Sequence, residues 1–175
     1  YSLVGFQNHL RYGEQARVLR LIPGLQNAEF LQFGQIHRNT YICSPRVLHA
    51  TMQMRDRPNL FFAGQITGVE GYVESVAMGW LAGVNAARLA AGLELLEAPA
   101  SSPTGALAHY VSHAEAKNFQ PVNITFALLP PLPEPARRTV RKKRERRQLQ
   151  VELALKEWAE WLEQNHTKRE IAHAS

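Results

Sequence analysis

The sequence has 175 residues, 45% of them hydrophobic, and a formal net charge of +5, which suits one folded domain with a basic appendage. It contains no run of about eighteen apolar residues, so we expect no membrane-spanning helix. Its one cysteine, Cys43, excludes an internal disulfide and a multi-thiolate metal site, which favours a cytoplasmic protein.

The N-terminal segment predicts one helix followed by strand-like residues. Residues 13–25 space their apolar side chains near helical periodicity and end at Pro23 and Gly24, which predicts a helix of two to three turns. Residues 30–42 alternate loosely and are rich in strand-forming types. Because Tyr1 is neither an initiator methionine nor the start of a signal peptide, we expect the chain to be cut from a longer protein.

Residues 60–91 combine an apolar run, a glycine turn and a helix. The run from Leu60 to Ala63 lacks polar alternation, which predicts a strand buried on both faces of a parallel sheet. After Gly64, a helix is expected from about Thr67 to Ala91, with small residues along one face that allow close approach to a sheet or a ligand. Unpaired N–H groups at its start favour an anion or an electron-rich ring edge, although a tight turn without a ligand is the alternative.

The C-terminal half predicts two helices separated by a connector. Residues 98–104 form a loop, 105–116 a short helix and 129–135 an extended Pro-rich connector. Residues 136–164 contain no Pro or Gly and predict a single helix of about 43 Å, at roughly 1.5 Å per residue. The second half of this helix is expected to dock through one apolar face, formed by Val151, Leu155, Trp158 and Leu162.

The basic character of the chain is local. Residues 137–147 hold eight of the twenty Lys and Arg residues and one acid, and outside them twelve bases face fourteen acids. A local basic element is how contact with a phosphate backbone is usually built, although a solvated helix face is the alternative. The candidate RNA-binding residues are Arg137, Arg138, Arg141, Lys142, Lys143, Arg144, Arg146 and Arg147.

Residues 59–75, NLFFAGQITGVEGYVES, closely resemble the second flavin-binding segment of the folate-dependent tRNA uracil-5-methyltransferase family. The resemblance extends over residues 1–165. Further matches in register are Gly13-Glu14-Gln15, Ile22-Pro23-Gly24-Leu25, His37-Arg38-Asn39-Thr40-Tyr41, Gly105 to Tyr110, Asn118 to Pro121, Asn123 and Pro130-Pro131.

This resemblance implies an α/β fold, namely the C-terminal part of a Rossmann-like FAD-binding domain, then a Pro-rich connector and a long basic helix. The FAD-binding part would cover residues 1–100, with its strand, glycine turn and helix at 59–91. A loop, short helix and connector would cover 101–135. A basic amphipathic helix would occupy 136–165, and a disordered tail 166–175.

The family implies methylation of carbon 5 of a T-loop uridine in tRNA. Reduced FAD and methylenetetrahydrofolate supply the methyl group, NAD(P)H is the reductant, and the protein aligns the cofactors. The resemblance places folate near His37, Arg38 and Asn39. It places FAD near Gly64, Gln65, Gly68, Val69, Glu70, Gly71 and Tyr72.

The resemblance assigns no catalytic residue and no metal to this chain. The family's cysteine nucleophiles and first dinucleotide motif belong to a portion preceding Tyr1, which is therefore an expected partner along with tRNA. Cys43 is interpreted as a half-buried filler. Two alternatives stay open: a sister flavoprotein family that modifies the tRNA wobble uridine, and a non-catalytic RNA-binding module.

Overall fold

The computed structural model describes residues 3, 8–34 and 39–173, with side chains as far as Asn165. Two compact units can be distinguished, residues 1–39 and residues 40–175. Across the described ranges, no helix combines the length and the apolar character needed to cross a membrane.

The first unit is organised around helix α1, Tyr12–Leu19. The side chain of Gln15 is buried, and its Nε2 donates to the carbonyl oxygens of Leu10 and Gly34, each at 2.9 Å. The ring of Tyr12 stacks on Phe33 at 5.7 Å. The helix is shorter than the predicted 13–25, because beyond Leu19 the main chain turns through bonds to carbonyls three residues back, before Pro23.

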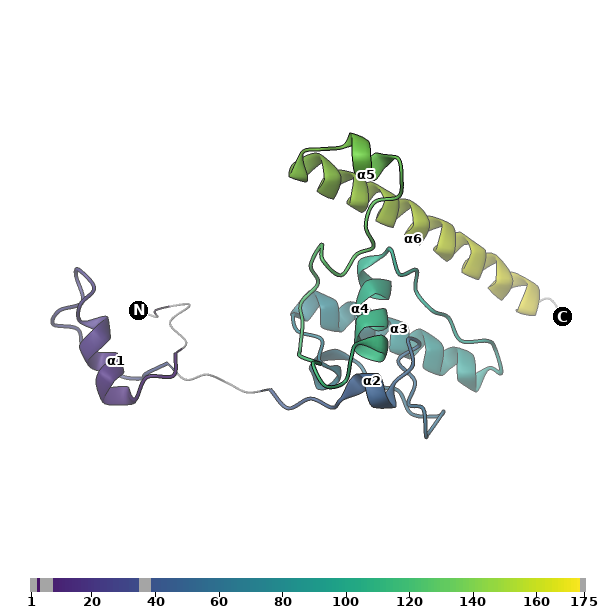
Figure 1. Cartoon of the computed structure of the whole chain (residues 1–175). Helices are drawn as coiled ribbons and strands as arrows, with labels where there is room; N and C mark the ends of the chain where they lie inside the picture. The colour runs from purple at the N-terminus through teal and green to yellow at the C-terminus, as the bar shows by residue number, and fades with distance from the viewer. Residues whose placement is uncertain (1–2, 4–7, 35–38, 174–175) are drawn as a thin grey trace. The chain divides into compact units, whose positions relative to one another are not determined.

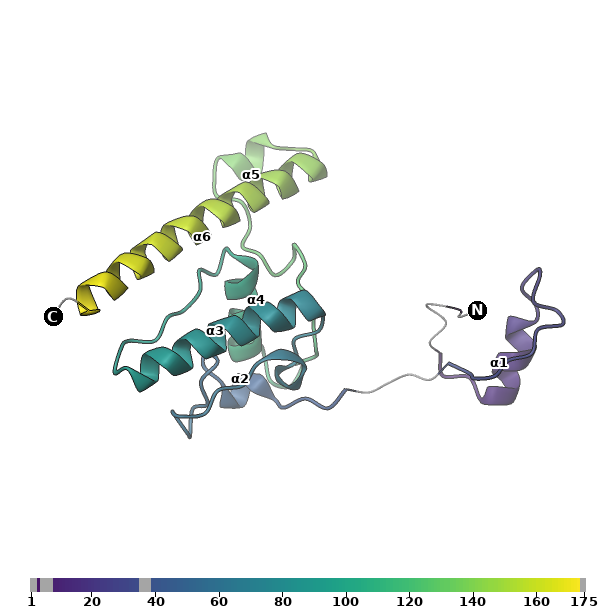
Figure 2. The same cartoon turned by 180° about the vertical axis from the view of Figure 1, so that it is seen from behind.

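The second unit packs helices around one apolar core (Figures 1 and 2). Its elements are α2 Ser44–Val47, the short 3-10 helix η1 Gly64–Thr67, α3 Tyr72–Ala90 and α4 Pro103–His113. Their apolar faces meet in a core whose fully buried side chains include Leu48, Met52, Val69, Met78, Leu81, Leu107 and Val111. Helices are thus present where 67–91 and 105–116 were predicted to be helical, but α3 begins five residues later than predicted, and α4 begins two residues earlier and ends three residues earlier.

The loop that follows α3 is held by polar side chains buried on that helix. Asn85 is fully buried; its Nδ2 donates to the carbonyl oxygens of Thr51 and Leu96, and its Oδ1 accepts from the N–H of Leu96 at 2.7 Å. One turn further, Arg88 Nε donates to the carbonyl oxygen of Glu94 at 2.6 Å. These bonds satisfy main-chain groups in a segment that has no regular secondary structure.

The predicted strands are not formed in the described residues, where only isolated bridges occur. Phe61 makes one antiparallel bridge to Gln53, and residues 61–63 are half-buried instead of buried on both faces. Residues 30–34 and 39–42 also contain no strand. The physical reason is that a central parallel strand needs a hydrogen-bonded neighbour on each side, and the described residues supply none.

The predicted helix at 136–164 is divided in two. Helix α5 covers Ala136–Thr139, and α6 runs from Lys143 to His173, which takes it into the predicted tail. A continuous helix would place cations of the basic run three and four residues apart on one face, where like charges repel. The break also lets the guanidinium of Arg146 donate to the carbonyl oxygens of Val140 and Arg137.

Helix α6 docks on α3 through a different face from the one predicted. Trp158 and Trp161 lie against Trp80, with ring centroids 5.8 and 6.3 Å away, and Ala154 is buried beside them. The predicted docking residues Val151, Leu155 and Leu162 are exposed, and only Trp158 of that group packs. Helix α6 thus turns toward α3 the face that carries both tryptophans.

The small-residue face of α3 is exposed at Gly79, Gly83 and Ala87, whereas Ala82 is buried in the core. Gly79 and Gly83 have no heavy atom within 4 Å of a built Cβ position, and the buried face of the helix carries Met78, Leu81 and Asn85 instead. In the described part of the chain, neither of these glycines makes the predicted close approach to a sheet or a ligand.

Candidate functional site

The predicted flavin-binding residues lie in the turn that joins η1 to α3. Gly64, Gly68 and Gly71 all have positive φ, at 73°, 82° and 98°, a region that other residues rarely adopt. Hydrogen bonds hold the turn: Thr67 Oγ1 donates to the carbonyl oxygen of Gly64 at 2.7 Å, and Ser44 Oγ donates to that of Thr67 at 2.9 Å. The main chain of the turn is therefore preorganised.

The inner side of the turn faces the protein core. A Cβ on Gly68 would lie 2.6 Å from Cζ of Phe119, so the aromatic ring that approaches this glycine belongs to the chain itself. Val69 is fully buried and forms a parallel bridge with Val122. Glu70 is half-buried, and its N–H donates to the carbonyl oxygen of Val122 at 2.9 Å. Gly68 and Val69 thus contribute to the core.

The outer side of the turn is open. Gly71 is the N-cap of the 19-residue helix α3 and provides no side chain to cap its first N–H groups. Tyr72 is 94% exposed and Val73 80%, and Gln65 is also exposed. The exposed apolar side chains fit a planar apolar ligand, whereas the Glu74 carboxylate, which lies next to Gly71, opposes an anion at the start of α3.

Several segments that carry the family resemblance meet behind this turn. Phe119, from the matched segment 118–121, lies 6.0 Å from the ring of Tyr41 and 5.7 Å from that of Tyr110. The N–H of Ile42 donates to the carbonyl oxygen of Ile66 at 2.9 Å. Sequence reasoning noted these matches without a role, and the structure gives one: they support the turn from the side opposite to the open face.

Glu74 also contributes to this turn, although its sequence pattern did not mark it as a site residue. It lies in the first turn of α3, and a Cβ on Gly71 would collide with its carboxylate. Its Oε1 accepts from the N–H of Ile124 at 3.4 Å. The sequence clue for Glu74 is that it falls in the first turn of a predicted helix, where a carboxylate interacts favourably with the helix dipole.

Two of the three predicted folate-binding residues, His37 and Arg38, lie outside the described residues. Asn39 is exposed.

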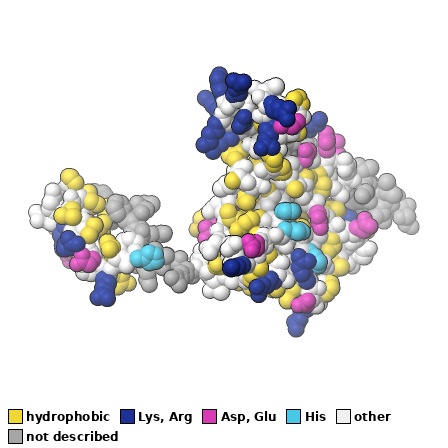
Figure 3. All heavy atoms as spheres, in the orientation of Figure 1, with side chains coloured by type: hydrophobic (Ala, Val, Ile, Leu, Met, Phe, Trp, Pro, Cys, Tyr) yellow, Lys and Arg dark blue, Asp and Glu magenta, His cyan; other side chains and the backbone are white. Residues whose placement is uncertain are grey.

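The predicted RNA-binding residues are all exposed, and they gather over α5 and the first turns of α6 (Figure 3). Among the described side chains, ion pairs engage two of them: Arg138 with Glu134 and Lys142 with Glu145, each at 3.3 Å. Arg146 caps the carbonyls of the α5 end. Arg146 therefore has a structural role, and Arg147 contacts the ring of Phe126, while the remaining cations of the run project from α5 and the start of α6.

Cys43 is half-buried, with its Sγ 3.9 Å from the carbonyl oxygen of Ala116. In the ranges that the structure describes, no three His, Cys, Asp or Glu side chains lie close enough together to hold a metal ion.

Comparison with known proteins gives one family and a consistent set of relatives. The model of the family described as Glucose inhibited division protein A matches residues 1–94. The chain is 60% identical, over 162 residues, to the methylenetetrahydrofolate–tRNA-(uracil-5-)-methyltransferase TrmFO of Koribacter versatilis. This match covers 93% of this chain and 36% of that protein. It is 58% identical to the protein of the same name from Solibacter usitatus, over 84% of this chain and 33% of that protein.

The chain thus spans about a third of the length of the curated relatives it matches. Among solved structures, Aquifex aeolicus GidA in its form II crystal is similar with a TM-score of 0.49 and 23% identity, over 66% of this chain and 20% of that one.

Proposed function

The chain belongs to the family described as Glucose inhibited division protein A, and we propose that it is part of a methylenetetrahydrofolate-dependent tRNA uracil-5-methyltransferase. The observation that carries this proposal is the 60% identity to a relative of that name over 93% of the chain. The proposed product is a tRNA uridine methylated at carbon 5, and the proposed place of action is the cytoplasm. The remaining portion of such a protein would complete the active site, and this chain would supply the closing part of a Rossmann-like FAD domain.

FAD is proposed to bind at the open side of the turn between η1 and α3. The exposed side chains of Tyr72 and Val73 suit the apolar faces of the ring system, and the Glu74 carboxylate beside Gly71 would keep the pyrophosphate away from the first turn of α3. Gly64 and Gln65 would lie near the ribityl or pyrophosphate part. When bound, FAD supplies the hydride chemistry of the reaction. Gly68, Val69 and Glu70 would act from behind, by fixing the main chain of the turn against Phe119 and Val122.

Methylenetetrahydrofolate and NAD(P)H are the proposed co-substrates. His37, Arg38 and Asn39 are proposed to contact folate. Their support is the sequence resemblance.

The basic run is proposed to hold the tRNA backbone. Exposed cations on α5 and on the start of α6 can neutralise several phosphates, and each such contact makes binding more sensitive to salt. A second candidate function, RNA binding without catalysis, is supported by the presence of the whole basic run in a chain that spans a third of its relatives.

The flavin proposal can be tested on the chain alone and on a joined protein, in which the chain replaces the segment that it matches in the Koribacter versatilis relative. FAD should raise the melting temperature, and the joined protein should purify yellow and methylate tRNA. Val73→Glu should weaken FAD binding by replacing an apolar contact to the ring system with a charge, with no loss of folding stability, because Val73 is exposed. Val151→Glu, at an exposed valine on α6, is the matched control. A colourless joined protein with no FAD-dependent stabilisation would count against the assignment.

The RNA contact can be tested separately by salt dependence. Neutralising Arg141, Lys142 and Arg144 to Gln should weaken tRNA binding and reduce the slope of log affinity against log salt by up to about 0.9 for each lost duplex phosphate contact. The control removes the same charge elsewhere, by changing exposed Arg46, Arg57 and Lys117 to Gln. Equal effects of the two triple variants would mean that the run is only a solvated helix face.

A further inference from the structure

We propose that the exposed ring of Phe126, held by Arg147, is a stacking site for one unpaired nucleobase of the bound RNA. The inference rests on the proposed RNA contact and gives it a second component, which distinguishes unpaired from paired nucleotides. Phe126 lies in the turn formed by residues 125–128, after the segment that supports the glycine turn.

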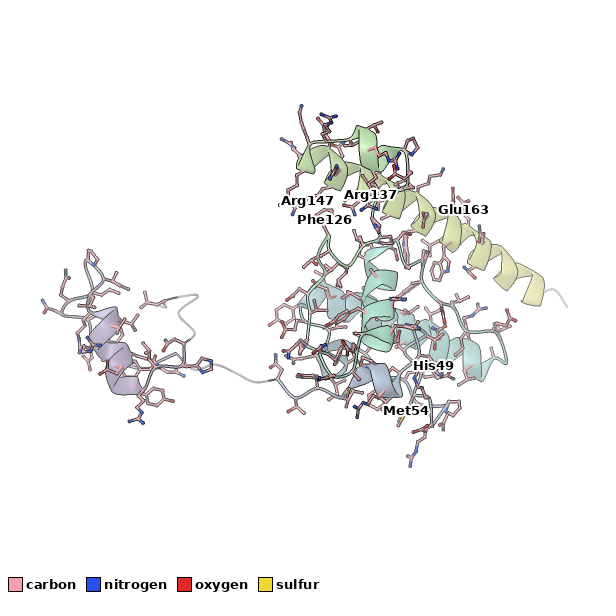
Figure 4. All side chains as sticks on the ribbon, in the orientation of Figure 1. His49, Met54, Phe126, Arg137, Arg147 and Glu163 are labelled. Atoms are coloured by element: carbon pink, nitrogen blue, oxygen red, sulfur yellow. The ribbon has the colours of Figure 1, made fainter. Side chains whose placement is uncertain are left out.

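The geometry of the ring is fixed from one side. The guanidinium of Arg147 lies 4.9 Å from the ring centroid, which is a cation–π contact between this turn and the first part of α6 (Figure 4). Two further bonds hold the segment: the N–H of Leu128 donates to the carbonyl oxygen of Thr125, and Gln150 Nε2 donates to that of Pro130 at 3.1 Å. A ring that is held in place loses little further entropy when a ligand stacks on it.

The ring is also accessible. Phe126 is 38% exposed, although it is a large apolar side chain in a unit that buries Phe119 almost completely. Figure 4 shows Phe126 beside Arg147 and on the same side of the unit as Arg137. An exposed aromatic ring among exposed cations is the combination that proteins use to bind single-stranded nucleic acids.

The chemical class of the ligand follows from this combination. The ring offers a flat apolar face, and Arg147 and the other exposed cations of α5 and of the start of α6 offer sites for the phosphates of the same strand. A paired base cannot use the ring, because its faces are covered by its neighbours in the helix. The site should therefore favour a loop or single strand over a duplex, and it should tolerate any base, because every base has a π-face.

The test compares the binding of a single-stranded 12-mer RNA that carries one 2-aminopurine with that of the same sequence as a duplex. Phe126→Leu keeps apolar volume but removes the aromatic face. It should weaken single-strand binding about tenfold or more and abolish the quenching of 2-aminopurine, while duplex binding changes less than about twofold. Phe126→Tyr, which keeps the aromatic face, should retain both the affinity and the quenching.

A purely structural role of Phe126 predicts different results. If the ring only holds α6 in place, Phe126→Leu will weaken single-strand and duplex binding equally and shift the emission of the tryptophans that dock α6. That result, or no change with either probe, would overturn the stacking site. If neutralising Arg141, Lys142 and Arg144 weakens binding while Phe126→Leu does not, the stacking site fails and the phosphate contact stands. If the triple variant binds unchanged while Phe126→Leu weakens only single-strand binding, the proposed phosphate contact is wrong and the stacking site stands.

Discussion

Replacing Gly68 with alanine tests why the turn before α3 carries glycine. Gly68 has a φ of 82°, and a Cβ there would lie 2.6 Å from Cζ and 3.0 Å from Cε1 of Phe119. The ring has little room to move, because Phe119 is buried between the rings of Tyr41 and Tyr110. The left-handed backbone costs about 1–2 kcal/mol, and displacing the ring costs about 1–3 kcal/mol more. We expect Gly68→Ala to lower the free energy of unfolding by roughly 2–5 kcal/mol.

Two other glycines separate these contributions. Gly64 also has a positive φ, but a Cβ added there would lie at an ordinary 3.6 Å from Ser75. Gly64→Ala should therefore lower the free energy of unfolding by only about 1–2 kcal/mol. Gly79 lies inside α3 with nothing within 4 Å, so Gly79→Ala should stabilise the protein by about 0.5–1 kcal/mol. Urea denaturation followed by circular dichroism gives all three values, provided that the m-value is unchanged.

A double-mutant cycle with Phe119→Ala identifies the ring as the cause. In that background the collision is gone, and Gly68→Ala should cost about 1–2 kcal/mol, leaving a coupling energy of about 1–3 kcal/mol. If Gly68→Ala costs the same in both backgrounds, or no more than Gly64→Ala, the ring of Phe119 is not the reason for glycine at position 68.

Two further predictions concern the packing around α3. Asn85→Ala should destabilise the protein by about 2–4 kcal/mol in the same denaturation assay, because it leaves buried main-chain groups without partners. The control Asn118→Ala, on the surface, should cost under about 0.5 kcal/mol. Equal losses of stability in the two variants would contradict this prediction. Trp80→Ala should release α6, seen as a red shift in the emission of Trp158 and faster trypsin cleavage after the basic run, and Trp80→Phe should do so less. An unchanged cleavage rate in Trp80→Ala would mean that the tryptophan contacts do not hold α6.

Local patterns in the sequence predicted helices where the reasons for the helix are themselves local. Helix α4 begins at Pro103 and is capped by the Ser102 hydroxyl, which accepts from the N–H of Gly105 at 3.0 Å. Helix α3 begins just after Gly71 and is rich in Ala. For these two elements, composition was sufficient to predict a helix but not its first residue, because α4 begins at Pro103, inside the predicted loop 98–104, and α3 begins at Tyr72 instead of about Thr67.

Predictions failed where a neighbour far along the chain decides the outcome. The run from Leu60 to Ala63 has strand-like residues, but a strand also needs partners in register, and the sequence pattern cannot say whether they are present. The break between α5 and α6 depends on Arg146, whose bonds to main-chain carbonyls are invisible in composition. The rotation of α6 depends on Trp80, a residue of another helix.

The glycine pattern that suggested a flavin site has two separable causes. Gly68 is required by the ring of Phe119 and by its own backbone conformation, so its presence is explained without any ligand. The open side of the turn is different, because Tyr72, Val73 and Val76 are large and apolar, and none of them is buried by the described chain. Substitutions at these three positions should leave folding stability nearly unchanged. Any loss of FAD binding that they cause would therefore report on the ligand itself, which a glycine substitution in this turn cannot do.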